Sequence, residues 1–208
     1  MIKESILRIN AQILRICSKI NRNPEEISIV TVSKGRSPQE IKEVILAGIT
    51  EIGENRVQEA ILKYRVLSTE YRVKWHMVGH LQTNKIKEAV KIFDLIQSVD
   101  SLDLAAEIDK QAAKINKIQD ILIEIKTSTE ATKLGLKPDE AIEVIKEIVR
   151  LKNINVKGLM TIAPLVDNPE KARPYFRMLR ELRDKLSQSV LSTPCSVLIT
   201  SLSKSRNV

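Results

Sequence analysis

Residues 27–67 of this chain read ISIVTVSKGRSPQEIKEVILAGITEIGENRVQEAILKYRVL, and this stretch predicts the fold. The run 27–34 is short and rich in β-branched residues, which is typical of a strand. Ser37 and Pro38 then supply a helix cap and a favoured first helical residue, so a helix is predicted to follow. A second strand and a second helix complete the stretch. A strand–helix order that repeats with short connections predicts a parallel sheet covered by helices.

The same order continues along most of the chain. Further strands are predicted over 49–53, 73–79, 94–100, 119–126 and 154–162. Further helices are predicted over 54–67, 82–93, 101–115, 139–151 and 169–186. Before the first strand, isoleucines recur every three or four residues from Ile2 to Ile20, which predicts a helix with one apolar face. The expected architecture is a doubly wound sheet or a closed (β/α)8 barrel, and a barrel needs two strands beyond the six that are clear.

The composition is that of an ordinary globular chain in a reducing compartment. Of its 208 residues, 43% are hydrophobic and 29% are charged, which argues against wholesale disorder. No apolar run reaches the roughly 18–20 residues that a membrane span needs, so no membrane partner is expected. Two cysteines, Cys17 and Cys195, make neither a disulfide framework nor a metal-ligand pattern, which favours the cytoplasm.

The net charge of +8 is a weak indication of a partner. Lysine and arginine are interleaved with acidic residues along most of the chain, and only 3% of the residues are aromatic. This pattern is typical of a solvated surface, so no nucleic acid partner is expected. The glycine and serine signatures of serine hydrolases, P-loop proteins and classical dinucleotide sites are absent as well.

Polar side chains follow the predicted strands, at the sheet edge where functional residues gather in such folds. Lys34 closes the first strand, where a partly buried lysine is a usable nucleophile, although it could also extend into solvent. Asn55 follows the second strand and could bind a ligand oxygen or begin the next helix. We interpret His76, within the third strand, as an inward-facing core histidine rather than a general base. No cysteine or carboxylate cluster accompanies His76 and His80, so no metal site is predicted.

Motifs spread along the chain form one recognisable set. They are TVSKGRSPQEIKEVILAGITEIGENRVQEA (31–60), WHMVGHLQTNK (75–85), LIQSVDSLDLAAEID (95–109), TKLG (132–135) and KGLMTIAP (157–164). Together they resemble the pyridoxal phosphate homeostasis proteins, whose second motif has the pattern W-H-x-x-G-x-L-Q-x-N-K. The resemblance covers roughly residues 1–190. It implies a single (β/α)8 barrel of the cofactor-binding kind, related to the N-terminal domain of alanine racemase.

The resemblance also implies a cofactor site at the strand ends. Lys34 matches the lysine that forms the internal aldimine with pyridoxal 5′-phosphate (PLP), and Asn55 matches an asparagine beside the cofactor ring. His76, Met160 and Thr161 would line the mouth from neighbouring strands. Family members are known mainly as PLP carriers and regulators of vitamin B6 pools without clear turnover, so no catalytic residue is expected. The implied partners are PLP and PLP-dependent apo-enzymes, and the implied state is a monomer.

The C-terminal segment departs from the family pattern. In the family, a Leu-Ser-Met-Gly-Met-Ser strand end and an Arg-Ile-Gly-Thr strand end hold the cofactor phosphate. Here Ser192 and Ser196 are the residues that could match those serines, and the segment has neither glycine nor acidic residues. We therefore expect an incomplete PLP-binding barrel over 1–189, missing its last strand–helix elements, and a divergent tail over 190–208 that arises from a truncation or a frameshift.

Three functions stay open at this point. The first is a PLP-binding homeostasis protein that holds the cofactor on Lys34 without turnover. The second is a PLP-dependent amino-acid racemase or lyase, although the chain supplies no second domain with the opposing base that a racemase needs. The third is a cofactor-free basic protein that binds nucleic acid or acts as a scaffold.

Overall fold

The structure, a computed structural model, describes residues 2–128, 130, 134–189 and 196–200. Within them the strands are β1 (Val30–Val32), β2 (Glu51–Glu54), β3 (Lys74–Met77), β4 (Leu95–Val99), β5 (Gln119–Glu124), β6 (Ile154–Ile162) and β7 (Ser196–Thr200). The α-helices are α1 (Ile2–Lys19), α2 (Pro38–Leu46), α3 (Val57–Leu67), α4 (Ile86–Ile92), α5 (Leu102–Ala113), α6 (Pro138–Ile148) and α7 (Arg173–Ser189). Across these residues, none of the helices has both the length and the apolar character that a membrane crossing requires.

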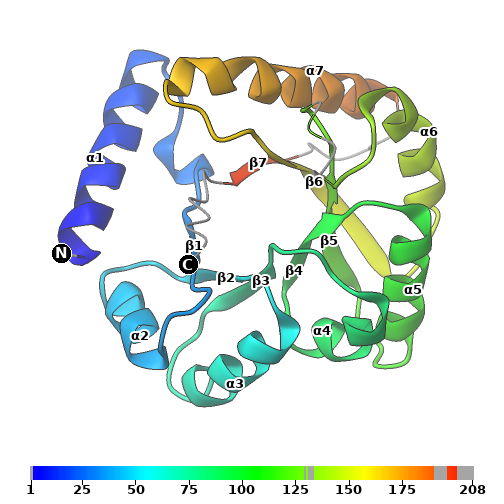
Figure 1. The fold of residues 1–208 in the computed structure, drawn as a ribbon, viewed down its shortest axis with the longest axis horizontal. Helices are drawn as coiled ribbons and strands as arrows, with labels where there is room; N and C mark the ends of the chain where they lie inside the picture. The colour runs from blue at the N-terminus through cyan, green and yellow to red at the C-terminus, as the bar shows by residue number, and fades with distance from the viewer. Residues whose placement is uncertain (1, 129, 131–133, 190–195, 201–208) are drawn as a thin grey trace.

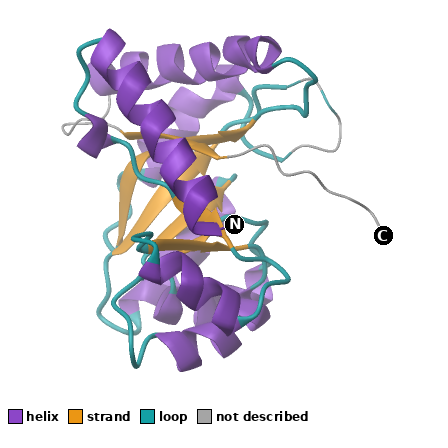
Figure 2. Cartoon of the chain, turned by 90° about the vertical axis from the view of Figure 1, so that its left-hand side faces the viewer, coloured by secondary structure: helices purple, strands orange, loops and turns teal. Residues whose placement is uncertain are grey.

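All seven described strands belong to one parallel sheet, in the order β1 to β7. Figure 1 shows the strands around a common centre, with α2 to α7 outside them, and Figure 2 shows the same strands from the side between layers of helix. A doubly wound sheet reverses its strand order at a switch point, and this sheet does not. The arrangement is therefore that of a (β/α)8 barrel, in which seven strands are described.

The cap predicted at the start of α2 is confirmed. The Ser37 hydroxyl accepts a hydrogen bond from the Glu40 backbone N–H, and the Glu40 carboxylate accepts one from the Ser37 backbone N–H at 2.8 Å. Pro38 is the first helical residue. This reciprocal cap satisfies two backbone donors and begins the helix directly after the turn that carries Lys34.

The hydrophobic core lies between the sheet and the surrounding helices. Trp75 of β3 is 1% exposed and packs edge-to-face against Tyr64 of α3, with ring centroids 5.9 Å apart. Ile52 and Ile96, on the neighbouring strands, are fully buried in the same cluster. Each such side chain contributes about 1.5–3 kcal/mol through burial. Because side chains alternate along a strand, the residues next to them, such as His76, face the barrel interior.

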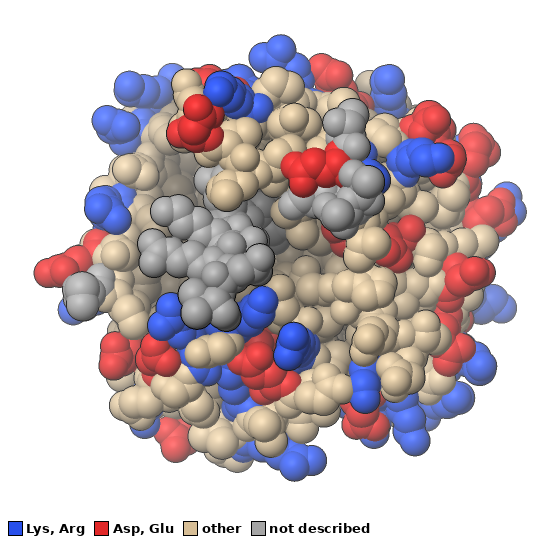
Figure 3. Space-filling view, viewed as in Figure 1, with Lys and Arg blue, Asp and Glu red and all other residues tan. Residues whose placement is uncertain are grey.

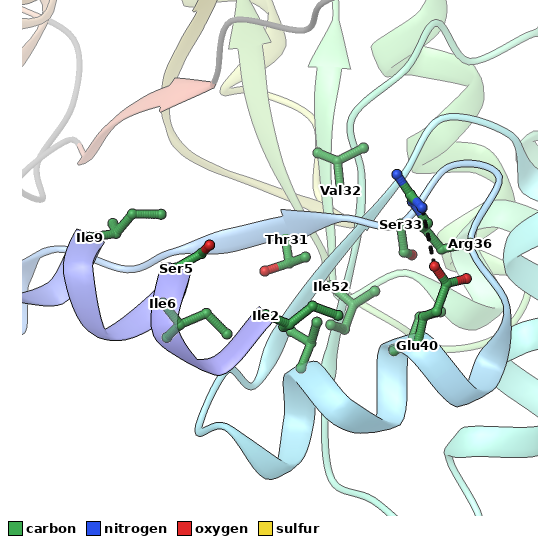
Figure 4. A pocket seen from close by; sticks show the side chains of 12 residues that line it. Ile2, Ser5, Ile6, Ile9, Thr31, Val32, Ser33, Arg36, Glu40 and Ile52 are labelled. Atoms are coloured by element: carbon green, nitrogen blue, oxygen red, sulfur yellow. Dashed lines mark hydrogen bonds and ion pairs between the residues drawn. The ribbon is translucent and has the colours of Figure 1, made fainter.

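The apolar face predicted for α1 is only partly buried. Ile6 is buried, whereas Ile16 and Ile20 are more than half exposed. The first turns of α1 line a groove of about 430 Å³ together with β1 and α2, and Figure 4 shows Ile9 and Thr31 on its walls. Cys17, near the other end of α1, is 1% exposed, so the helix has a buried residue near each end while much of its apolar face stays exposed.

The first predicted strand ends earlier than expected, and a further strand follows residue 189. β1 ends at Val32, so Lys34 does not close the strand but lies beyond it. Residues 196–200, which were expected in a divergent tail, form β7 and pair in parallel with β6, with Ser196 opposite Gly158. The physical reason is that the run SVLIT has the β-branched and apolar character of a strand, and the edge of β6 offers it unpaired backbone groups. The sheet therefore continues past the predicted boundary at residue 189.

Candidate functional site

Lys34 lies in a tight turn that follows β1. The Arg36 backbone N–H donates to the Ser33 carbonyl oxygen at 2.9 Å, and Gly35 has a φ of 68°. A positive φ at the third residue is what a type II turn requires, so glycine suits this position. The Lys34 side chain is exposed, because the strand has already ended. The expectation of a partly buried lysine is therefore wrong, although Lys34 does lie at the carboxyl end of β1.

A buried charged cluster holds this turn in place. Lys63 of α3 donates from Nζ to the Ser33 carbonyl oxygen at 2.6 Å and to Glu54 Oε1 at 2.6 Å. Its third hydrogen bond goes to Glu59 Oε1 at 2.7 Å. The Ser33 hydroxyl donates to Glu54 Oε1, and the Gly35 backbone N–H donates to Glu59 Oε1 at 2.6 Å. We call Ser33, Glu54, Glu59 and Lys63 the Lys63 cluster.

The sequence gives little sign of the Lys63 cluster. Glu59 and Lys63 have the i, i+4 spacing of a solvated ion pair on a helix surface. In the fold, however, the side chains of Lys63 and Glu54 are only 5% and 0% exposed. Partial burial acts to raise the pKa of the Glu59 carboxyl, but its hydrogen bonds with Lys63 and with the Gly35 N–H lower that pKa overall. Glu59 is therefore ionised at neutral pH.

Asn55 follows β2 and offers an acceptor atom to a ligand. Its Oδ1 atom is buried and accepts no hydrogen bond from the described part of the chain. A buried amide oxygen without a partner is costly, so a ligand or water that donates to it would be stabilised. The β1–β2 pairing sets Val32 opposite Gly53, and Lys34 and Asn55 each lie two residues beyond this pair, Lys34 within its turn. Both residues therefore lie at the same end of the sheet, and contact between their side chains stays a prediction.

Gly79, two residues after the end of β3, allows the close approach of the Asn55 backbone. A Cβ atom at residue 79 would lie 2.5 Å from the Asn55 carbonyl oxygen and 2.8 Å from its Cα. Both contacts are with backbone, which cannot rotate away as a side chain can. Only glycine fits here without moving the chain that carries Asn55.

We expect Gly79→Ala to lower the free energy of unfolding by about 2–3 kcal/mol, because the added methyl overlaps the Asn55 backbone. Gly48→Ala is the matched control: its φ of 97° is strained for alanine, but no atom lies within 4 Å of the added Cβ. Gly48→Ala should lower the free energy of unfolding by about 1–2 kcal/mol, because alanine is strained in a left-handed backbone conformation. Urea unfolding measures both values. An equal decrease in the free energy of unfolding for the two variants would show that the Asn55 backbone moves away from the added methyl at little energetic cost.

His76 is a buried residue of the barrel interior. Its Nδ1 atom lies 2.8 Å from Gln97 Nε2, which must donate to it, so the ring proton sits on Nε2. Nε2 lies 3.7 Å from Glu51 Oε2. Burial lowers the pKa of His76 below its usual value, although Glu51 and Asp94 act in the opposite direction. The burial agrees with an inward-facing histidine that is neutral at pH 7, but Nε2 has no hydrogen-bond partner among the described residues, so the ring is not fully satisfied by the protein.

This lowered pKa predicts a loss of stability in mild acid. Below the ordinary histidine pKa of about 6.5, the unfolded chain binds a proton that folded His76 does not, so stability falls as the pH decreases. Between pH 7.5 and 5.5, wild type should lose about 1 kcal/mol more than His76→Gln. His80→Gln is the control, because the side chain of His80 is 52% exposed. Urea unfolding at both pH values tests this, and an equal pH dependence in wild type and His76→Gln would contradict it.

Met160 and Thr161 are both fully buried near the carboxyl end of β6. Met160 is fully buried in β6, opposite Glu124 of β5. The Thr161 hydroxyl donates to the Ile125 carbonyl oxygen at 2.7 Å and accepts from the Thr127 hydroxyl at 2.8 Å. These bonds tie β6 to the chain that leaves β5. These hydrogen bonds give the Thr161 hydroxyl protein partners, and its place in the lining of the mouth stays a prediction.

Ser192 and Ser196 are the two residues predicted to contact the cofactor phosphate. Ser192 lies outside the described residues. Ser196 is the first residue of β7, and its pairing with Gly158 places it three positions before the level of Thr161. The register therefore does not favour Ser196 as a contact at the carboxyl ends of the strands. Among the residues that the structure describes, no group of three histidine, cysteine, aspartate or glutamate side chains could hold a metal ion.

Comparisons with known proteins agree with this geometry. The family model described as alanine racemase, N-terminal domain, matches residues 8–206. The pyridoxal phosphate homeostasis protein of Aquifex aeolicus is 42% identical over 185 residues, which make up 89% of this chain and 81% of that protein. The structure of PipY from Synechococcus elongatus with PLP bound is 31% identical and has a TM-score of 0.78, covering 89% of this chain and 86% of that one.

A more distant likeness is limited to the fold. Alanine racemase of Clostridium difficile, in complex with cycloserine, is 17% identical with a TM-score of 0.73, covering 93% of this chain and 52% of that one. The Aquifex and Synechococcus proteins match most of their own length as well as most of this chain. The matches in sequence and in fold agree, and the chain belongs to the pyridoxal phosphate homeostasis protein family.

Proposed function

We propose that this chain binds PLP covalently through Lys34 and holds it for PLP homeostasis, without turning over a substrate. The observation that carries the proposal is the buried, unpartnered Oδ1 atom of Asn55 directly after β2, at the same end of the sheet as the exposed Lys34 in the turn after the neighbouring β1. The names of the relatives support it: the Aquifex protein is called a pyridoxal phosphate homeostasis protein, and PipY was solved with PLP bound.

The residues at these strand ends fit the aldehyde end of PLP. When bound, PLP supplies an aldehyde that condenses with a primary amine and releases one water. Lys34 provides that amine, on a turn held by the Lys63 cluster. Asn55 Oδ1 can accept a hydrogen bond from a polar ring substituent, which would satisfy the buried oxygen. Ser192 is the proposed contact for the phosphate.

The surroundings of His76 favour a carrier over a racemase. A racemase needs an acid or a base on each face of the reacting carbon. His76 is neutral and 4% exposed, and its Nδ1 atom is held by Gln97, so a general-acid or general-base role for its ring is not favoured. The same fold occurs in an alanine racemase. The test must therefore distinguish PLP binding without turnover from amino-acid racemisation.

The proposed recipients are PLP-dependent apo-enzymes, because a carrier must pass its cofactor to proteins that use it. We propose a monomer in the cytoplasm. On the face that Figure 3 shows, blue and red groups are interspersed rather than gathered into one basic surface, which does not favour a nucleic acid partner. Light scattering during gel filtration measures the oligomeric state, and a dimer would contradict that part of the proposal.

The test is covalent capture of PLP by the purified full chain. Incubation with PLP should give a visible absorbance band that borohydride reduction removes, and peptide mass spectrometry should then locate the reduced adduct on Lys34. A chain that stays colourless, or an adduct on another lysine, would overturn the proposal. Racemisation of amino acids above the buffer rate by the loaded chain would favour the racemase instead, and salt-sensitive RNA binding without a band would favour a nucleic-acid-binding protein.

A further inference from the structure

The Lys63 amine is fully occupied by protein groups. An ammonium has three donors, and those of Lys63 go to the Ser33 carbonyl oxygen, to Glu54 and to Glu59. Its side chain is 5% exposed. Lys63 therefore cannot serve as a second reactive amine without giving up a buried hydrogen bond. The role of the Lys63 ammonium is to fix the positions of the groups that accept its hydrogen bonds.

The groups that it holds lie on both sides of Lys34. Ser33 is bound through its carbonyl oxygen to Lys63 and through its hydroxyl to Glu54. Gly35 is bound through its backbone N–H to Glu59, which Lys63 also binds. The peptide units before and after Lys34 are thus anchored to the same ammonium, although the Lys34 side chain itself is exposed.

The same ammonium also fixes the strand end that carries Asn55. Glu54 is the last residue of β2 and directly precedes Asn55, and its side chain has no exposed surface. Lys63 joins this carboxylate to the Ser33 carbonyl oxygen at equal distances of 2.6 Å. One side chain of α3 therefore fixes the end of β1 relative to the end of β2, and with it the relation between Lys34 and Asn55.

We propose that Lys63 is a positioning residue for the capture of PLP by Lys34. This proposal rests on the function proposed above. Lys63 acts through the turn and the strand end and touches no cofactor atom itself. Since a reactive amine must meet its target in a narrow range of geometries, loosening the turn lowers the rate of capture while leaving the amine in place.

The variant that tests this is the double change Lys63→Met with Glu54→Gln. The single change Lys63→Met leaves the Glu54 carboxylate buried without its counter-ion, so a failure to capture PLP could result from poor folding alone. Neutralising Glu54 as well removes the unpaired charge, while residue 54 keeps an oxygen that can accept from the Ser33 hydroxyl. The Ser33 carbonyl oxygen still loses its bond to Lys63.

Lys117→Met is the matched control. Lys117 is also a partly buried lysine, and its Nζ donates to the backbone carbonyl oxygens of Val90 and Phe93 at 2.8 and 2.7 Å. It precedes β5 and so lies at the amino ends of the strands, away from Lys34. Its replacement removes comparable bonds without touching the turn.

Stopped-flow absorbance over a series of PLP concentrations gives both a limiting rate of capture and a half-saturating concentration. In the double variant we expect the limiting rate to fall on the order of 10-fold to 100-fold, with an unchanged half-saturating concentration, while Lys117→Met keeps the wild-type rate. Hydrogen exchange without PLP should be faster at the Gly35 amide in the double variant. A limiting rate within about twofold of wild type in the folded double variant would overturn the proposal.

The two proposals fail in different ways. If wild type captures no PLP, the proposed function is wrong, and the exchange rate of the Gly35 amide still reports whether Lys63 holds the turn. If wild type captures PLP on Lys34 and the double variant does so equally fast, the function stands and the positioning role of Lys63 is wrong.

Discussion

Lys34→Ala is expected to abolish covalent capture of PLP, so that the variant gives neither the visible band nor a borohydride-reduced adduct. The amine at this position is the group that the proposed function requires, and alanine has no nucleophile to replace it. The side chain of Lys34 is exposed and lies in a turn, so the free energy of unfolding should change by less than about 0.5 kcal/mol. Absorbance, peptide mass spectrometry and urea unfolding measure these effects.

Lys126→Ala is the control for this prediction. Lys126 also follows the carboxyl end of a strand, β5, and is partly exposed. Its loss should leave the band and the adduct unchanged. If Lys34→Ala kept the band and Lys126→Ala lost it, the cofactor would be attached to the other strand end, and the assignment of Lys34 would be wrong.

Lys63→Met is expected to lower the free energy of unfolding by about 3–5 kcal/mol. Removing one partner of a buried ion pair leaves the other charge without compensation, and Glu54 has no exposed surface over which water could reach it. One of its oxygens, Oε2, already lacks a hydrogen-bond partner among the described residues. Urea unfolding at neutral pH measures the loss.

The double variant Lys63→Met with Glu54→Gln tests whether the unpaired Glu54 carboxylate causes this loss of stability. With Glu54→Gln added, no buried charge is left alone, so at least about 2 kcal/mol of the loss should be regained. Lys117→Met, which removes hydrogen bonds to carbonyl oxygens but leaves no carboxylate alone, should cost only about 1–2 kcal/mol. If the double variant were no more stable than Lys63→Met, the loss would come from the lysine side chain itself and not from the unpaired carboxylate.

The periodicity of the chain was sufficient to predict the sheet. Strands rich in β-branched residues alternate with helical segments over 27–162, and every strand predicted there exists, with shorter bounds at β1, β3, β4 and β5 and a shift toward the C-terminus at β2. The number of strands could not be predicted from the sequence alone. A short apolar run such as SVLIT can form a strand or a loop, and it forms a strand only where the edge of a neighbouring strand can pair with it. The edge of β6 makes it a strand.

The site was predicted in part. The motif residues Lys34 and Asn55 both follow neighbouring parallel strands, and the strand–helix order of the sequence was sufficient to predict this. The role of Thr161 was not predictable, because its partners Thr127 and Ile125 are more than thirty residues away in the sequence. The same holds for Lys63 and Ser33, which are separated by a whole strand–helix unit.

The sequence by itself therefore determined the family, the parallel strand–helix order and the lysine that the proposed function uses. Those features depend on residue types and on spacings within a few turns of chain. Only the tertiary structure decided that Lys34 is exposed, that Glu54 and Lys63 are buried together, and that Asn55 Oδ1 lacks a partner. Burial and hydrogen-bond partners are properties of groups brought together from distant parts of the chain, and no local pattern specifies them.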